Sequence, residues 1–142
     1  MSKHYASARW QGNLLKGNGA YKLNTSDYQG TIKFTSRFED DKTASSPEEL
    51  IGAAHASCFS MAFSHALDQA GFTPDYIDTE AVVSLEKGDA GFGISEIFLK
   101  TKGKVPGIQK DKFLSIANEA KENCPVSKAL KAVNIKLEAE ML

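Results

Sequence analysis

The stretch that decides the fold of this chain is S-P-E-E-L-I-G-A-A-H-A-S-C-F-S-M-A-F-S-H-A-L-D-Q, residues 46–69. It starts with helix signals, because Ser46 suits an N-cap, Pro47 suits the first helical position, and two glutamates follow at the positive end of the helix dipole. No charged residue occurs between Glu49 and Asp68. A surface helix would interrupt such a run, so the sequence predicts a helix that is buried on most sides.

The two faces of this predicted helix differ in their side chains. One face is a stripe of small side chains that allows another backbone to approach closely, and the opposite face has Cys58 at its middle. The small stripe comprises Ala53, Ala56, Ser57, Ser60 and Ser64, and the opposite stripe comprises Ile51, His55, Cys58, Ala62 and His65. One of the two cysteines of the chain is therefore expected on the central helix.

Length and composition predict one soluble globular domain over residues 1–142. The formal net charge is -1 and Lys and Arg form no local cluster, so neither nucleic acid nor an anionic membrane is an expected partner. The first ten residues lack the apolar segment of a secretory signal, and the Gly, His and Ser content of the long helix disfavours a membrane span. Two cysteines 66 positions apart fit reduced thiols, or a cycling pair, in the cytoplasm.

The rest of the chain predicts strands on both sides of the helix. Alternating side chains indicate three strands before it, two long strands after it, a further helix with a short helical segment at Pro125, and a closing strand. In order, these elements are expected at residues 3–12, 20–24, 30–38, 46–70, 77–85, 94–104, 109–123, 125–131 and 133–141. The order βββ-α-ββ-α-β predicts an α+β fold with an antiparallel sheet. Residues 94–99 fit no single alternation, which leaves a bulge or burial on both sides open.

Two thiols are the candidates for chemistry. Cys58 on a core helix is, taken alone, best explained as a small apolar side chain. Cys124 directly precedes Pro125, at a helix junction where unpaired N–H groups and the dipole favour a thiolate. Both cysteines lie on apolar helix faces that should meet in one core, so a redox-active pair is a second explanation. The spacing is not C-x-x-C, and thioredoxin-like exchange is not indicated.

Other kinds of site are less well supported by the residues. His55 lies one turn before Cys58 and is either its base or, as we favour, a hydrogen-bonded core histidine. No metal site is expected, because His55 and His65 are about 15 Å apart along a helix and no further ligands have zinc-like spacing. The glycines of G-D-A-G-F-G (88–93) lie in a predicted hairpin and do not form a phosphate-binding loop. No cofactor is therefore expected.

Several motifs of the chain resemble those of the OsmC/Ohr family, and of its osmotically inducible OsmC branch in particular. The most specific are S-P-E-E-L-I-G-A-A-H-A-S-C-F-S-M (46–61) and N-C-P-V-S-K (123–128). Shorter ones are R-F-E (37–39), A-G-F-T-P (70–74), D-A-G-F (89–92) and V-P-G-I (105–108). The resemblance covers essentially the whole chain. It implies an OsmC-like antiparallel sheet wrapped around a long central helix, in an intertwined homodimer.

The same resemblance implies an activity, that of a cysteine-based peroxidase that reduces organic hydroperoxides. It makes Cys58 the peroxidatic thiol, Cys124 the resolving thiol, and Arg37 with Glu48 the polar pair that activates Cys58. The implied reductant is an external dithiol, with a lipoyl-type dithiol as one candidate. Bulky apolar hydroperoxides are favoured as substrates by four side chains expected near the thiol, namely Phe38, Phe59, Met61 and Phe63.

Spacing along the chain bears on these implied roles. Glu48 precedes Cys58 by ten residues, about 15 Å along one helix, whereas antiparallel packing of two such helices in a dimer shortens that distance. Arg37 alternates onto the polar side of its predicted strand, where a surface arginine is the plain expectation. Glu48, by position alone, is a first-turn charge at the helix dipole. Two other functions remain open, a thiol-based redox sensor and a non-catalytic dimeric binder of small ligands.

Overall fold

The computed structural model describes all 142 residues, which form two compact units, Met1–Leu50 and Ile51–Leu142. The first unit contains a three-stranded antiparallel sheet in the order β1-β2-β3. Its strands are β1 (Ala6–Gln11), β2 (Asn18–Leu23) and β3 (Tyr28–Ile32). The three predicted strands are thus present, and the expectation of one domain over residues 1–142 stays a prediction.

The third strand ends earlier than predicted, because a short helix, α1 (Phe34–Phe38), follows it. The prediction that Arg37 lies on a strand is therefore wrong. Phe34 and Phe38 stack with ring centroids 4.8 Å apart, which their four-residue spacing allows on a helix. Ser36 closes the turn, since its hydroxyl accepts from the backbone N–H of Lys33 at 3.2 Å and donates to the backbone oxygen of Ser45 at 2.7 Å.

The second unit is built on the sheet β4-β5-β6, made of β4 (Tyr76–Gly88), β5 (Gly91–Lys104) and β6 (Asn134–Met141). β4 and β5 form a long antiparallel hairpin whose register shifts between Ser84 and Leu85, which confirms a bulge near the start of β5. β6 departs from the antiparallel expectation, because it pairs with β5 in parallel. The chain returns between them through α3 (Lys110–Asn123) and α4 (Pro125–Ala129), a connection long enough for a parallel crossover.

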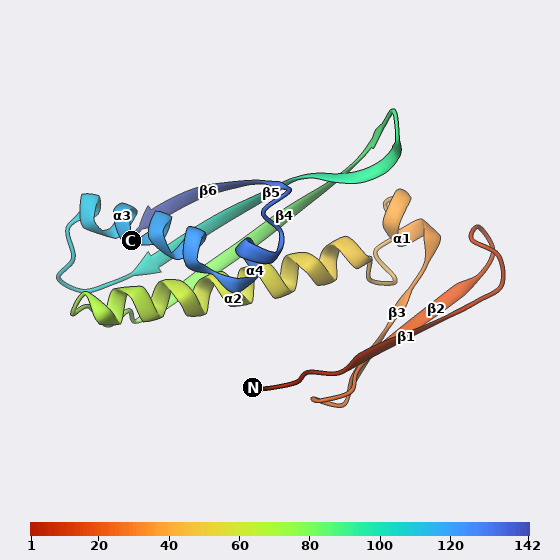
Figure 1. Cartoon of the computed structure of the whole chain (residues 1–142), viewed down its shortest axis with the longest axis horizontal. Helices are drawn as coiled ribbons and strands as arrows, with labels where there is room; N and C mark the ends of the chain where they lie inside the picture. The colour runs from red at the N-terminus through yellow and green to blue at the C-terminus, as the bar shows by residue number, and fades with distance from the viewer. The chain divides into compact units, whose positions relative to one another are not determined.

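The long helix α2 (Pro47–Gln69) packs one face on this sheet (Figure 1). Its ends are as predicted, because the Ser46 hydroxyl accepts from the backbone N–H of Glu49 at 3.1 Å and Gly71, with a φ of 88°, follows the last turn. The buried face repeats every three or four residues: Gly52, His55, Phe59, Phe63 and Leu67. Phe63 meets Phe113 of α3 edge to face at 5.1 Å, so both helices contribute to one core with β5.

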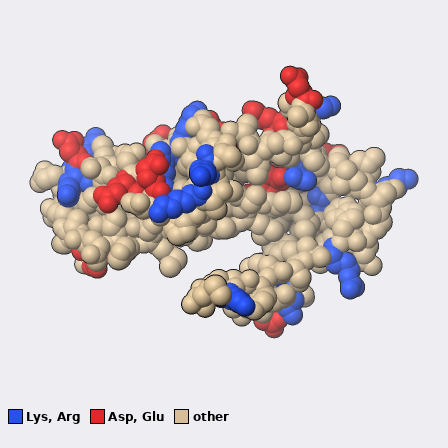
Figure 2. Space-filling view, viewed as in Figure 1, with Lys and Arg blue, Asp and Glu red and all other residues tan.

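The other face of α2 is exposed, so the expectation of burial on most sides does not hold within the single chain. Its exposed residues are Ala53, Ala54, Ser57, Met61 and His65, and Met61 is 74% exposed. Ser60, expected on the small-residue stripe, instead donates to the Thr79 hydroxyl of β4 at 2.8 Å. Charged side chains of both signs are mixed on the visible surface, whereas the surface over α2 is largely uncharged (Figure 2).

By length and composition alone, α2 also meets the criterion for a membrane-crossing helix. Core helices of soluble proteins meet the same criterion. Only 28% of the most apolar 18 residues of α2 is buried in the single chain. Most of this helix is therefore exposed apolar surface.

Candidate thiol site

The structure brings the two predicted thiols together. Cys58 lies in the middle of α2, and Cys124 lies at the junction between α3 and α4, with Pro125 at the first position of α4. Both thiols are free, and the side chain of Cys124 lies beside that of Cys58, close enough to interact with it. Cys124 is fully buried, while Cys58 is partly exposed. A pair of thiols in contact, with one reachable from outside, is an arrangement that a disulfide can close.

Burial raises the pKa of the Cys58 thiol, and the neighbouring Cys124 raises it further. The backbone N–H of Val126, in the first turn of α4, donates to Cys58 and acts in the opposite direction. The sequence predicts that free N–H groups of this junction favour a thiolate at Cys124, whereas the N–H of Val126 acts on Cys58. Within residues 51–142 the net effect favours the neutral thiol of Cys58, so a thiolate there requires a further source of positive charge.

His55, one turn before Cys58, lies fully buried, and its Nε2 is 2.8 Å from the hydroxyl of Ser127 on α4. Its Nδ1 has no hydrogen-bond partner. Burial lowers the pKa of His55, which keeps the ring neutral. The favoured interpretation of His55 as a hydrogen-bonded core histidine is confirmed, and His65 lies on the exposed face of α2.

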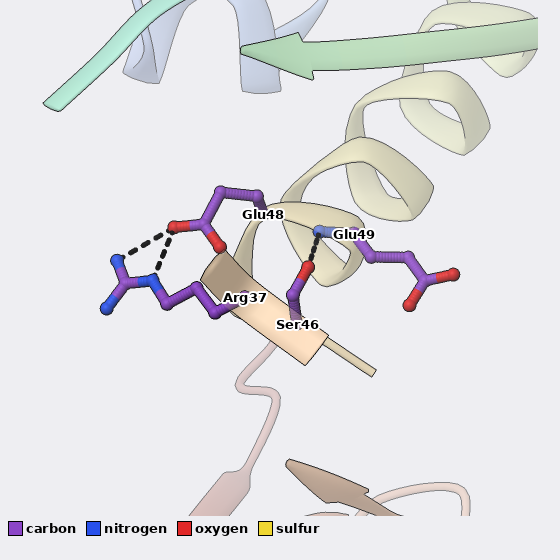
Figure 3. Close-up of polar contacts among 4 residues, drawn as sticks. All are labelled: Arg37, Ser46, Glu48 and Glu49. Atoms are coloured by element: carbon purple, nitrogen blue, oxygen red, sulfur yellow. Dashed lines mark hydrogen bonds and ion pairs between the residues drawn. The ribbon is translucent and has the colours of Figure 1, made fainter. Parts of the chain in front are cut away.

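Arg37 and Glu48 form an ion pair at the start of α2 (Figure 3). The Nε and Nη2 atoms of Arg37 donate to the same oxygen, Oε1 of Glu48, at 2.9 and 2.7 Å. Glu48 is only 7% exposed, and its Oε2 has no hydrogen-bond partner. The arginine side chain is 39% exposed. The buried carboxylate thus fixes the direction of a guanidinium that still has donors to spare.

The two pairs belong to different units of the chain. Arg37 and Glu48 lie in Met1–Leu50, whereas Cys58 and Cys124 lie in Ile51–Leu142. The geometry of the Arg37–Glu48 pair and that of the Cys58–Cys124 pair are therefore described separately.

No group of three or more His, Cys, Asp and Glu side chains is arranged to hold a metal ion.

Of the four side chains expected around a substrate, three lie on α2, namely Phe59, Met61 and Phe63, and Phe38 is the last residue of α1. Phe59 and Phe63 are fully buried in the core between α2 and the sheet, and their rings contact each other at 5.7 Å. Met61 is on the exposed face of α2. The two phenylalanines hold the helix in place, so they give no support to the expected preference for bulky apolar hydroperoxides.

Two contacts of the site were not foreseen from the sequence, the N–H donated by Val126 and the hydroxyl of Ser127. One signal was available, because Ser127 follows Cys124 by three residues and His55 precedes Cys58 by three. Residues three apart on a helix lie on the same side, so matched spacings in two facing segments indicate a second contact beside the first.

The comparisons with known proteins agree with the arrangement of the helices and sheets. The family model described as OsmC-like protein matches residues 39–138. The chain belongs to the OsmC family. Among relatives of this family, the chain is 51% identical over 126 residues to Peroxiredoxin OsmC of Escherichia coli strain K12, covering 88% of this chain and 87% of that protein.

A second OsmC-type relative is more distant. Organic hydroperoxide resistance protein OhrB of Bacillus subtilis strain 168 is 34% identical over 104 residues, 70% of this chain and 73% of that protein. The solved structure of OhrB covers 97% of this chain and 98% of its own, with a TM-score of 0.70 and 24% identity. An OsmC-like protein of unknown function from Vibrio cholerae has a TM-score of 0.78 at 16% identity, covering 98% and 99%. These structural likenesses support the OsmC fold, in which two sheets accompany a long central helix.

Proposed function

We propose that this chain is a peroxiredoxin-like thiol peroxidase that reduces organic hydroperoxides to alcohols. Cys58 is the peroxidatic thiol and Cys124 is the resolving thiol. The observation that carries the proposal is the contact between the partly exposed thiol of Cys58 and the buried thiol of Cys124. The printed names of its relatives, a peroxiredoxin and an organic hydroperoxide resistance protein, support the same reaction.

The first step is attack of the Cys58 thiolate on one peroxide oxygen. The O–O bond breaks, an alkoxide leaves and takes up a proton as the alcohol, and Cys58 becomes a sulfenic acid. In the second step the thiol of Cys124 displaces hydroxide from that sulfenic acid, which gives a Cys58–Cys124 disulfide and one water. An external dithiol then reduces the disulfide, and a lipoyl-type dithiol is one candidate. These steps use no metal or organic cofactor.

Arg37 supplies the positive charge that the thiolate needs. A guanidinium about 4 Å from the sulfur, at an effective dielectric near 20, favours the anion by about 4 kcal/mol. That corresponds to roughly three pKa units, more than the ordinary distance between a cysteine pKa and neutral pH. Glu48 positions Arg37 through the two hydrogen bonds to its Oε1.

The protein acts as a homodimer in this proposal. Ten residues of helix separate Glu48 from Cys58, about 15 Å along one helix, so the Arg37–Glu48 pair serves the Cys58 of a second copy. The exposed, uncharged face of α2 is the surface that a second copy would cover. Burying that apolar face also stabilises the helix. We place the homodimer in the cytoplasm, where the thiols are kept reduced between cycles.

The test is steady-state consumption of an organic hydroperoxide by the purified protein with dithiothreitol, compared with consumption of hydrogen peroxide. We expect faster turnover with the organic substrate, no turnover for Cys58→Ser, and a single oxidation to a trappable sulfenic acid for Cys124→Ser. A monothiol reductant in place of the dithiol should support less turnover.

The same assay distinguishes the two rival functions. A redox sensor would be oxidised once and turn over poorly, and a non-catalytic ligand binder would consume no peroxide. Normal steady-state turnover by Cys58→Ser would refute the assignment of the peroxidatic thiol.

A further inference from the structure

A second polar contact runs beside the thiol pair and joins the same two segments. α2 contributes His55 and Cys58, which are three residues apart, and the junction with α4 contributes Cys124 and Ser127, which are also three apart. The His55 ring bonds to the Ser127 hydroxyl at 2.8 Å, and the Cys58 thiol contacts that of Cys124. Two contacts between one turn of α2 and one short segment fix both the distance and the register of the two thiols.

This contact is not explained by core packing alone. His55 is 0% exposed and Ser127 is 6% exposed, so both polar groups are withdrawn from water. Ser127 is the hydrogen-bond partner of His55, and Nδ1 of the same ring has none. An apolar ring would fill this site without an unpartnered nitrogen, so the retained hydrogen bond indicates a role in holding α4 against α2.

We propose that His55 and Ser127 are positioning residues for the disulfide step, which hold the segment bearing Cys124 within reach of Cys58. The proposal rests on the proposed function insofar as that disulfide belongs to the catalytic cycle. The condensation needs this positioning because the two sulfurs must pass from contact to a bond of about 2.05 Å with a defined dihedral angle. In that step the Cys124 thiol loses a proton, the Cys58 sulfenic acid loses hydroxide, and water leaves.

The hydrogen bond between His55 and Ser127 raises the effective concentration of the Cys124 thiol at Cys58. When α4 is free to shift or fray, Cys58 and Cys124 meet less often and the disulfide forms less readily. A short helix of five residues has little stability of its own, so its position depends on such tertiary contacts.

The test is the thiol–disulfide equilibrium of the full chain in defined mixtures of reduced and oxidised dithiothreitol. The reaction is quenched by alkylation, and the Cys58–Cys124 disulfide is quantified by mass spectrometry. We expect Ser127→Ala to lower the equilibrium constant for disulfide formation at least about tenfold, a change of about 30 mV in reduction potential. Ser127→Thr keeps the hydroxyl and should restore most of the loss.

Ser60→Ala is the matched control, because it removes a hydroxyl of α2 that bonds to β4 rather than to α4. It should leave the disulfide equilibrium within about twofold of the wild type. If Ser127→Ala does not fold, His55→Phe removes the same hydrogen bond while filling the core, and it should give the same shift. Equilibria for Ser127→Ala, or for His55→Phe in its place, that match Ser60→Ala would overturn the proposal.

A peroxide arm separates this inference from the proposed function. With one equivalent of an organic hydroperoxide, Ser127→Ala should form the Cys58 sulfenic acid at the wild-type rate and condense at least about tenfold more slowly. A second equivalent of hydroperoxide should then oxidise more of that sulfenic acid to sulfinic acid than in the wild type. Condensation at the wild-type rate would count against the positioning role. Failure of wild-type Cys58 to react with any organic hydroperoxide would instead refute the proposed peroxidase, while the dithiothreitol equilibrium would still decide the role of Ser127.

Discussion

Removal of Arg37 should destabilise the protein more than neutralisation of Glu48, because the two partners are buried to different extents. Glu48 is 7% exposed and its Oε2 has no partner, so Arg37→Ala leaves a buried carboxylate with both oxygens unsatisfied. Breaking a fully buried pair costs about 3–5 kcal/mol and an exposed pair contributes about 0.2–1 kcal/mol. The 39% exposure of Arg37 places its loss between these limits, at about 2–3 kcal/mol.

Glu48→Gln should cost less, about 1 kcal/mol, because the half-exposed guanidinium regains water. The assay is urea unfolding of the single and double variants at one fixed protein concentration, analysed as a double-mutant cycle. We expect a coupling energy of about 1–2 kcal/mol. The control cycle uses Lys102 and Glu140, which are 3.1 Å apart and more than half exposed, and which should couple by less than about 0.5 kcal/mol. Additive effects of Arg37→Ala and Glu48→Gln would show that the burial argument is wrong.

Three further predictions concern the thiolate, the buried histidine and the dimer. Arg37→Ala should raise the pKa of Cys58 by about one unit or more, measured by alkylation rate against pH, and superimposable curves would exclude Arg37 as the activating cation. Burial lowers the pKa of His55 from 6.5, so on acidification the unfolded chain binds a proton at this residue before the folded chain does. The free energy of unfolding should therefore fall as the pH drops from about 6.5 toward the lowered pKa of the folded state. His55→Phe should flatten this slope in urea titrations at several pH values. Met61→Glu, at a side chain 74% exposed in the single chain, should shift the protein toward monomer in sedimentation, and an unchanged dimer would place the interface elsewhere.

The long helix was predictable because its boundaries are set by local chemistry. Ser46 and Pro47 define its start, and Gly71 adopts the positive φ that ends it, so these signals act within a few residues. The bulge in the β4–β5 hairpin was likewise visible as a failure of alternation after Ile94. Local patterns of this kind depend little on the rest of the fold.

The errors occur where local patterns are ambiguous. Phe34 and Phe38 are four residues apart, which suits one face of a strand and one face of a helix equally well, so Arg37 was placed on a strand. Alternation in residues 133–141 shows that β6 is half-buried but carries no information about its direction. The lack of charge on α2 shows that it needs cover, and it cannot distinguish cover by the same chain from cover by a second copy.

The two cysteines of the candidate site were predictable from the sequence, whereas the polar contacts around them were not. Cys58 and Cys124 were singled out by their helix faces and by the family resemblance, and the structure places them in contact. Ser127 was missed because a serine in a short helix has many ordinary explanations. Its bond to His55 joins residues 72 positions apart, and such a pairing depends on the tertiary fold.

The parallel pairing of β5 and β6 has a consequence for newly made chains. Cys58 is synthesised 66 positions before Cys124, and β6, which pairs with β5, is synthesised after both. Contacts between distant positions form late, because the entropy of closing the intervening loop must be overcome first. A nascent or truncated chain therefore presents Cys58 without its neighbour, and any sulfenic acid formed there lacks an internal thiol to capture it. Under the proposed mechanism, oxidative stress during translation would thus damage unfinished molecules at this cysteine, while finished ones would form the disulfide.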